Sequence, residues 1–290
     1  MIEFRKLKKT YGPLTAVDEL TLTIDEGCVF GFIGRNGAGK TTTIRMMMGL
    51  LEPTSGTVVI AGHDIRREPE RAKALTGYLP DHPYLYDKLT AYEFLRFVGG
   101  LYSVPEAERD SRSQQLLADF ALTERAGELV ETYSHGMKQR LALAAALLHQ
   151  PRILILDEPM VGLDPQGALD FRRLLARLAS EGRTIFLSTH SLAVAEELCD
   201  RIGVLDRGRL VALGDLAELR ARAASMPAAR ELRDMIRVQS TRPSEASGVW
   251  GPRRAPLEGG EGQRPSLEEP GGATLEAVFL QLISANEGEW

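Results

Sequence analysis

The chain has 290 residues, of which 43% are hydrophobic and 26% are charged, and its formal net charge is −5 at pH 7. This length and apolar content are sufficient for a sizeable buried core in one or two domains. The negative net charge excludes a general electrostatic attraction to nucleic acid, so we expect no nucleic-acid partner.

Neither a membrane span nor a secretory signal is expected from the sequence. The longest uninterrupted apolar run covers residues 141–148, far short of the roughly 20 residues that cross a bilayer. The first ten residues, MIEFRKLKKT, lack the apolar core of a signal peptide. Cys28 and Cys199 lie far apart in the sequence, which indicates buried reduced thiols rather than a disulfide framework or a metal site. We therefore expect a chain that stays in the cytosol.

Short apolar, β-branched runs alternate with helical patterns along the first 220 residues. The runs are CVFGFI (28–33), VVIA (58–61), ILIL (153–156), TIFLS (184–188) and IGVLD (202–206). Such alternation predicts an α/β fold with a buried, largely parallel sheet.

A glycine-rich loop follows the first of these runs. Residues 34–41, GRNGAGKT, fit the pattern G-x-x-x-x-G-K-[ST] and precede a helical stretch, TTTIRMMMGLL. In such a loop the backbone N–H groups surround an anion, Lys40 reaches the β- and γ-phosphates, and the Thr41 hydroxyl can ligate Mg²⁺. The alternative, a glycine-rich turn without a ligand, is disfavoured by the flanking strand and helix.

Helical patterns replace strands between about Pro83 and Gln150, which indicates a helical subdomain inserted into the α/β core. Thr90 and Glu93 form a capping box at the start of one helix, and Pro105 marks the start of a second. A third helix is expected after Ser134, within ETYSHGMKQR (131–140). Because Ser134 and Gly136 are small, the N-terminus of this helix is open and suits an anion.

Polar residues follow two of the later strands. The run ILIL leads into Asp157 and Glu158, at the strand end where α/β sheets bind ligands. There Asp157 would hold Mg²⁺, through water, and Glu158 would orient and deprotonate an attacking water. The alternative is a pair of acids that only meets solvent. His190 follows TIFLS and would lie on the same rim, although a lone histidine at a strand end is usually structural.

The composition changes after residue 213. The stretch AELRARAA still has a helical pattern, but 13 of the 48 residues from 225 to 272 are Gly or Pro, and seven Arg are balanced by seven acidic residues. This composition predicts a flexible linker over 225–272. The apolar stretch TLEAVFLQLIS (274–284) predicts a short helix within 273–290. We expect that helix to pack on the main body, since an isolated helix of this length is only marginally stable.

Four motifs in this order carry a family resemblance. With the loop 34–41, YSHGMKQR (133–140), LILDEPMVGLDP (154–165) and LSTH (187–190), the chain resembles the nucleotide-binding subunit of an ATP-binding cassette (ABC) transporter over about residues 1–220. The resemblance implies a P-loop NTPase core with an ABC-type antiparallel β subdomain and an inserted helical subdomain at about 83–150. It also implies ATP and Mg²⁺ as cofactors and ATP hydrolysis coupled to transport.

The resemblance assigns roles to individual residues. Glu158 and His190 match the general base and the switch histidine, and Asp164 matches the loop that communicates between subunits. Tyr11 matches the aromatic residue that stacks on adenine, and Ser134 and Gly136 match the γ-phosphate contacts of the signature motif. The nucleotide-binding set is Tyr11, Gly34, Arg35, Asn36, Gly37, Ala38, Gly39, Lys40, Thr41, Thr42, Ser134 and Gly136. The metal-binding set is Thr41, Asp157 and Asp81.

The sequence departs from the family pattern at several positions. The signature usually reads Leu-Ser-Gly-Gly-Gln, and here Tyr133, His135 and Met137 replace three of those residues. Asp81 stands where the family has a glutamine that ligates Mg²⁺, and a carboxylate there either binds the metal more strongly or repels the γ-phosphate. Met160 replaces a more usual Thr or Ser.

The resemblance also implies partners. In the family two cassettes, identical or different, enclose two nucleotides head to tail, and a polytopic permease forms the channel. The cassettes of bacterial ABC exporters whose membrane subunits are separate polypeptides have a similar combination of Asp81, the signature variant and GLDP. This resemblance implies a location on the cytoplasmic face of the membrane. The transported substrate is not encoded in these motifs. Two alternatives are a soluble ABC ATPase with a non-transport partner and a small-molecule P-loop kinase.

Overall fold

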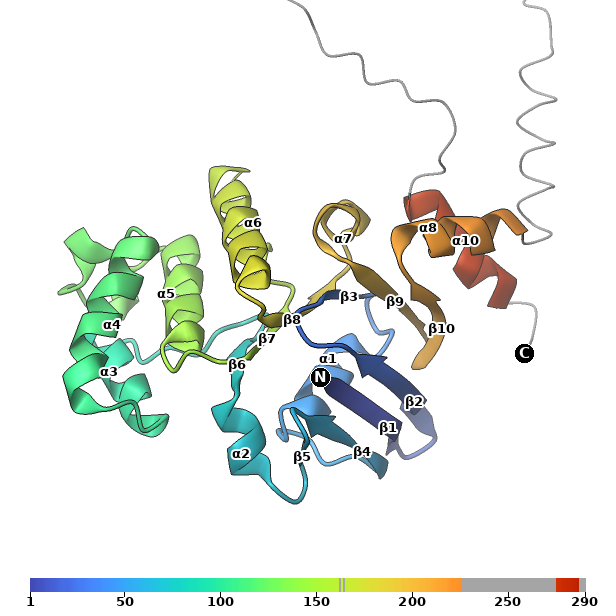
Figure 1. Ribbon diagram of the computed structural model, residues 1–290, viewed down its shortest axis with the longest axis horizontal. Coiled ribbons are helices and arrows are strands. Elements are labelled where there is room, and N and C mark those ends of the chain that lie inside the picture. The colour runs from blue at the N-terminus through green and yellow to red at the C-terminus, as the bar shows by residue number, and fades with distance from the viewer. Residues whose placement is uncertain (162, 164, 226–274, 287–290) are drawn as a thin grey trace, which may run out of the picture. The chain divides into compact units, whose positions relative to one another are not determined.

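The computed structural model describes residues 1–161, 163, 165–225 and 275–286 (Figure 1). The chain divides into two compact units, Met1–Leu219 and Arg220–Trp290. The expected linker 225–272 lies outside the described residues except for its first residue, Ser225. The expected C-terminal helix is present as α10, Leu275–Asn286, and the helix expected after residue 213 is present as α8, Leu216–Ser225.

A four-stranded antiparallel sheet forms one part of the first unit. Its order is β2-β1-β4-β5. The strands are β1 (Ile2–Tyr11), β2 (Leu14–Ile24), β4 (Ser55–Ile60) and β5 (His63–Asp64). Strands β1 and β2 were not predicted from the sequence, although the buried Ile2 and Phe4 alternate with more exposed neighbours. The run at 58–61 was expected in the parallel sheet, which is wrong: Val58 pairs with Phe4 of β1 in an antiparallel ladder.

The second sheet has six strands in the order β10-β9-β3-β8-β7-β6. They are β3 (Val29–Gly34), β6 (Thr76–Leu79), β7 (Ile153–Asp157), β8 (Thr184–Thr189), β9 (Arg201–Asp206) and β10 (Arg209–Gly214). Five of them pair in parallel, and only β10 runs antiparallel to its neighbour β9. β3, β7 and β8 are buried throughout, as expected for strands covered on both faces.

Helices cover the two faces of this sheet. On one face α1 (Lys40–Met47) is packed between the two sheets, and its Ile44, Met46 and Met47 share a core with Phe4 and Phe186, whose ring centroids lie 6.2 Å apart. On the other face, α6 (Pro165–Ser180) and α7 (Leu192–Leu198) pack against alternate residues of β7 and β8. A short α2, Pro69–Ala74, precedes β6. Because α1 packs against both sheets, its position is fixed from two sides.

Three helices gather beside β6 and form the inserted helical subdomain (Figure 1). They are α3 (Ala91–Leu101), α4 (Glu106–Asp119) and α5 (His135–Leu147). The Thr90–Glu93 capping box is present, α4 begins directly after Pro105, and Ser134 caps α5, as the sequence predicted. α5 lies so close to β6 that a Cβ at Gly77 would be 2.4 Å from the Ala146 carbonyl oxygen.

The two cysteines are free thiols on opposite faces of the parallel sheet. Cys28 packs against the core around α1, whereas Cys199 packs against the core that contains α6. Burial raises the pKa of Cys28 to about 11 and that of Cys199 to about 12, so both remain protonated near neutral pH. Within the described part of the chain, no helix combines the length and the apolarity required to span a membrane.

His149 joins the end of α5 to the core of the unit. Its ring stacks on Tyr102 with centroids 3.8 Å apart, and its Nε2 lies 3.1 Å from the carbonyl oxygen of Thr76. Burial lowers the pKa of His149 to about 4, well below its ordinary value.

We therefore predict an acid-induced loss of stability that depends on His149. Between pH 6.5 and 4 the unfolded chain binds a proton at this residue that the folded chain does not, so the free energy of unfolding falls as the pH drops through this range. The free energy of unfolding, measured with urea, should fall less between pH 7 and pH 5 in His149→Gln than in the wild type. The difference should be on the order of 1 kcal/mol. His82→Gln, whose side chain is 86% exposed, serves as the control. Equal losses in the wild type and His149→Gln would refute the prediction.

Candidate functional site

The glycine-rich loop 34–41 connects β3 to α1, and its shape requires glycine. Gly37 and Gly39 have φ values of 81° and 107°, which residues with a side chain rarely adopt. A Cβ on Gly39 would lie 2.4 Å from the carbonyl oxygen of Ala16, and one on Gly34 would lie 2.5 Å from that of Leu205. The backbone is therefore held in a tight turn at the start of α1, where helix N–H groups are unpaired.

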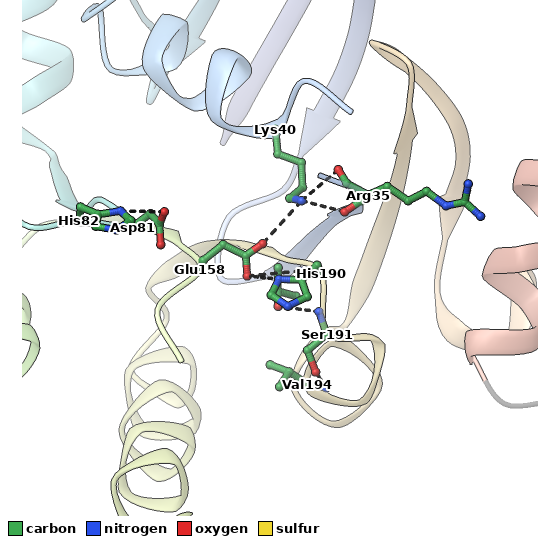
Figure 2. Close-up of polar contacts among 10 residues, drawn as sticks. Arg35, Lys40, Asp81, His82, Glu158, His190, Ser191 and Val194 are labelled. Atoms are coloured by element: carbon green, nitrogen blue, oxygen red, sulfur yellow. Dashed lines mark hydrogen bonds and ion pairs between the residues drawn. The ribbon is translucent and has the colours of Figure 1, made fainter. Parts of the chain in front are cut away.

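Lys40 lies over this loop with its side chain only 7% exposed. Its Nζ donates to the carbonyl oxygen of Gly34 at 2.7 Å and lies 3.4 Å from that of Arg35. The same ammonium lies 3.5 Å from Oε1 of Glu158, which comes from the end of β7 (Figure 2). A cation buried at this depth is placed to meet anionic oxygen atoms at the mouth of the loop.

Glu158 is held on its other side by His190. Nδ1 of His190 lies 2.9 Å from Oε2 of Glu158, and the His190 backbone N–H lies 3.4 Å from the same oxygen. The Glu158 side chain is 14% exposed and that of His190 is 57% exposed. The structure therefore brings together Lys40 at the start of α1, Glu158 directly after β7 and His190 directly after β8 (Figure 2).

Asp157 is almost completely buried, at 1% exposure, and its Oδ1 has no hydrogen-bond partner among the described residues. Burial raises the pKa of Asp157, and the nearby carboxylates of Glu158 and Asp81 act in the same direction. The hydroxyls of Ser188 and Thr41 oppose this shift. A buried carboxylate oxygen without a donor is costly, and a cation at this point would remove that cost.

Asp81 follows β6, and its carboxylate lies 2.9 Å from Nδ1 of His82 (Figure 2). This contact with His82 was not predicted from the sequence. Among the described residues, no group of three or more His, Cys, Asp or Glu side chains is arranged to hold a metal ion by itself.

The remaining predicted residues lie in two separate places. Tyr11, at the end of β1, is 47% exposed, and Lys9 Nζ lies 5.2 Å from its ring centroid. Ser134 accepts a hydrogen bond from the Met137 N–H at 3.4 Å, and nothing lies within 4 Å of a Cβ built on Gly136. Among the described residues, no hydrogen bond or ion pair joins Tyr11 or Ser134 to the cluster of Lys40, Glu158 and His190. Asp164 lies outside the described residues.

The β9–β10 hairpin supports the glycine-rich loop. This support was not predicted from the sequence. The Gly208 N–H donates to the carbonyl oxygen of Ala38 at 2.9 Å, and the Asp18 N–H donates to the carbonyl oxygen of Gly208 at 2.9 Å. The Asp18 carboxylate in turn pairs with Lys8 at 2.8 Å and with Arg209 at 2.7 Å. Gly208 lies in the turn between β9 and β10, about 170 residues beyond the loop. Only its place in a hairpin turn could have drawn attention to it.

Comparison with known proteins identifies close similarities. The ABC transporter family model matches residues 17–161. The linearmycin resistance ATP-binding protein of Bacillus subtilis is 40% identical over 222 residues, which is 77% of this chain and 71% of that protein. The bacitracin transport ATP-binding protein of Bacillus licheniformis is 41% identical over 212 residues, covering 73% of this chain and 68% of that protein.

Solved structures agree with these sequence similarities. The structure of an ATP-binding subunit of an ABC transporter is 35% identical with a TM-score of 0.73, and the match covers 83% of this chain and 100% of that one. A dimeric ATP-binding cassette in a post-hydrolysis state, bound to ADP and Pi, is 27% identical with a TM-score of 0.69. That match covers 74% of this chain and 99% of the other. The expected P-loop NTPase fold is confirmed by these neighbours.

The support from the β9–β10 hairpin gives a testable prediction. Gly208 has a φ of 81°, and its Cβ would lie 2.8 Å from the carbonyl oxygen of Ala16, so Gly208→Ala should displace the loop 34–41. We expect a loss of about 1–3 kcal/mol in unfolding free energy and a weaker affinity for ATP in a fluorescent nucleotide titration. Gly182→Ala is the matched control, since Gly182 has a φ of 83° with nothing within 4 Å. If both variants bind ATP equally well, Gly208 does not support the loop.

Proposed function

Because the chain belongs to the ABC transporter family and is an ATP-hydrolysing subunit of a transporter, we propose that it forms composite ATP sites with a second cassette and drives export through a separate membrane-spanning permease. The observation that carries this proposal is the convergence of Lys40, Glu158 and His190 beside the glycine-rich loop. We assign residues 1–220 to the cassette, with a helical subdomain at about 83–150.

The loop residues 34–42 would hold the phosphates of ATP. Their backbone N–H groups and the N-terminus of α1 favour negative charge, and the Lys40 ammonium would contact the β- and γ-phosphates instead of the loop carbonyls. Tyr11, with its exposed ring, would stack on the adenine. Both assignments place the nucleotide between the antiparallel sheet and the parallel sheet's carboxyl edge.

The oxygen atoms beside Lys40 fit a magnesium ion. The Thr41 hydroxyl and the Asp157 carboxylate are ligands of the kind that Mg²⁺ prefers, and Oδ1 of Asp157 has no other partner among the described residues. Since no group of His, Cys, Asp or Glu here is sufficient alone, phosphate oxygens and water would complete the coordination. Asp81 is the further candidate ligand. Bound Mg²⁺ would neutralise charge on the β- and γ-phosphates.

Glu158 is placed to act as the general base in hydrolysis. Its carboxylate lies at the mouth of the loop and would accept a proton from the attacking water. His190 orients that carboxylate through the 2.9 Å contact and, being half-exposed, can also reach a γ-phosphate. Lys40 would leave Glu158 for the nucleotide, which frees one carboxylate oxygen for the water.

The signature helix α5 would serve the nucleotide held by the second cassette. Ser134 and Gly136 lie at an open helix N-terminus, and no hydrogen bond or ion pair among the described residues joins them to the Lys40 cluster. A phosphate bound there would belong to the nucleotide of another chain. A related cassette is known as a dimer bound to ADP and Pi. Identical or different cassettes would satisfy this arrangement equally.

The loop after β6 offers a surface for the permease. Tyr84 is 98% exposed and Tyr86 is 58% exposed, and Phe97 lies edge-on to Tyr86 with centroids 5.2 Å apart. Exposed aromatic residues gathered in this way are typical of protein interfaces. We propose that helices of the permease contact residues 81–87 and place the chain on the cytoplasmic face of the membrane. The relatives that act in antibiotic resistance or transport support export.

Replacing the general base should trap the closed dimer. Glu158→Gln keeps the shape of the side chain but cannot accept the water proton, so hydrolysis should fall by about 10²- to 10⁴-fold. The γ-phosphate then persists, and size-exclusion chromatography with ATP should show a dimer. Glu52→Gln, at a side chain 79% exposed, is the control and should behave as the wild type does. A Glu158→Gln protein that stays monomeric with ATP would count against the proposed sandwich.

The role of Asp81 predicts a changed magnesium requirement. If its carboxylate ligates Mg²⁺, Asp81→Ala should raise severalfold the Mg²⁺ concentration that gives half-maximal hydrolysis. His82→Ala removes the 2.9 Å contact but keeps the Asp81 carboxylate, so it should leave that concentration unchanged. An Mg²⁺ requirement equal to the wild type in Asp81→Ala would reject Asp81 as a ligand.

A further inference from the structure

Gln139 makes a buried contact between α5 and the turn that follows β7. The residue is 5% exposed, and its side-chain Nε2 donates to the carbonyl oxygen of Pro159. Pro159 is the residue directly after Glu158. Among the described residues, no other hydrogen bond joins α5 to the turn formed by residues 157–160.

The orientation of the Gln139 amide is fixed by this contact. A carbonyl oxygen accepts but cannot donate, so the amide nitrogen must face Pro159. Oε1 of Gln139 is then left without a partner among the described residues. A buried polar side chain that satisfies only one of its groups is poorly explained by stability alone, because an apolar side chain would fill the same space.

The turn that receives this hydrogen bond has a strained backbone. Glu158 has a φ of 50°, in the left-handed region that a residue with a side chain rarely adopts. Such a conformation persists only where neighbours hold it. On the sheet side the Glu158 N–H donates to the carbonyl oxygen of Ser188 at 2.9 Å. On the α5 side, the Gln139 amide donates to the carbonyl oxygen of the next residue, Pro159.

A cavity next to Gln139 lies between the N-terminal parts of α5 and α6. It has a volume of about 820 Å³, and its lining includes Ser134 and Gly136 on one side and Leu163 and Gln166 on the other. Gln139 also lines this cavity. It lies five residues after Ser134, about 7.5 Å further along the helix axis. The hydrogen bond to Pro159 is therefore close to the end of α5 that carries Ser134.

We propose that Gln139 is a positioning residue for ATP hydrolysis. Its amide ties the helix that carries Ser134 to the strained turn that carries Glu158. This inference rests on the proposed function, in which Ser134 contacts the nucleotide of the second cassette while Glu158 acts on the nucleotide of its own. A displacement of α5 by one ATP therefore displaces the general base that acts on the other, and the two sites are coupled through one side chain.

The test uses the full chain with Gln139→Met, which keeps the length of the side chain and removes the donor. We expect kcat to fall about tenfold or more, because a misplaced general base is costly. ATP affinity, measured by titration with a fluorescent ATP analogue, should stay within about twofold of the wild type. Gln139→Glu, which keeps the shape but cannot donate to a carbonyl when ionised, should lose activity similarly. Gln115→Met, on an exposed position of α4, is the matched control.

A second comparison separates positioning from a purely structural role. In the Glu158→Gln background, adding Gln139→Met should lower the residual single-turnover rate no further, because the residue that Gln139 positions is no longer a base. Ser134→Ala should likewise cost less in kcat when Gln139 is already Met, since the link is cut. Thermal unfolding of each variant reports whether the fold is retained.

The outcomes distinguish the inference from the proposed function. If Glu158→Gln hydrolyses ATP as fast as the wild type, the proposed role of Glu158 is wrong. If Glu158→Gln is inactive while folded Gln139→Met keeps the wild-type kcat, the inference about Gln139 alone is wrong. Additive losses in both double variants would also overturn it.

Discussion

The parallel pairing of β7, β8 and β3 is the constraint on which the site depends. In this ladder Asp157 pairs with Ser188, and Ile33 pairs with Thr189, so the three strands end at one edge of the sheet. Each strand is followed directly by a residue or loop of the candidate site: Glu158, His190 and the glycine-rich loop. Glu158 thereby comes within 3.5 Å of Lys40, which is more than a hundred positions away in the sequence, and within 2.9 Å of His190. Slipping any one strand by a single residue would separate them.

Backbone strain accompanies this convergence. Gly37 and Gly39 have positive φ values at no steric cost, but Glu158 adopts a φ of 50° with a full side chain. The strain at Glu158 is balanced by hydrogen bonds from two directions, one to β8 and one from α5. Because α5 belongs to the helical subdomain and β8 belongs to the core, Glu158 lies where the two subdomains meet. The position of its carboxylate then depends on how these subdomains are arranged, which suits the role in hydrolysis that we propose for it.

Local signals in the sequence predicted local structure well. The Thr90–Glu93 capping box, the Ser134 N-cap and the loop 34–41 each depend on residues a few positions apart, and each is present. Strand β1 was missed because charged residues interrupt its apolar alternation after Phe4. The run at 58–61 was assigned to the wrong sheet, since a short apolar run does not reveal its pairing partner.

Contacts between distant segments could not be predicted. Nothing near Gly208 indicates that its N–H supports Ala38, and nothing near Gln139 indicates a contact with Pro159. Both depend on the completed tertiary fold. Family membership, in contrast, follows from the order of several motifs, and it removes the alternative of a small-molecule kinase.

The central claim is that one nucleotide is held by two chains. A structure of the chain with Mg²⁺ and a non-hydrolysable ATP analogue tests it most directly. We predict that the terminal phosphate lies within hydrogen-bond distance of Lys40 from one chain and of Ser134 from a second chain. A terminal phosphate that contacts Lys40 while Ser134 of every chain remains distant would contradict the account.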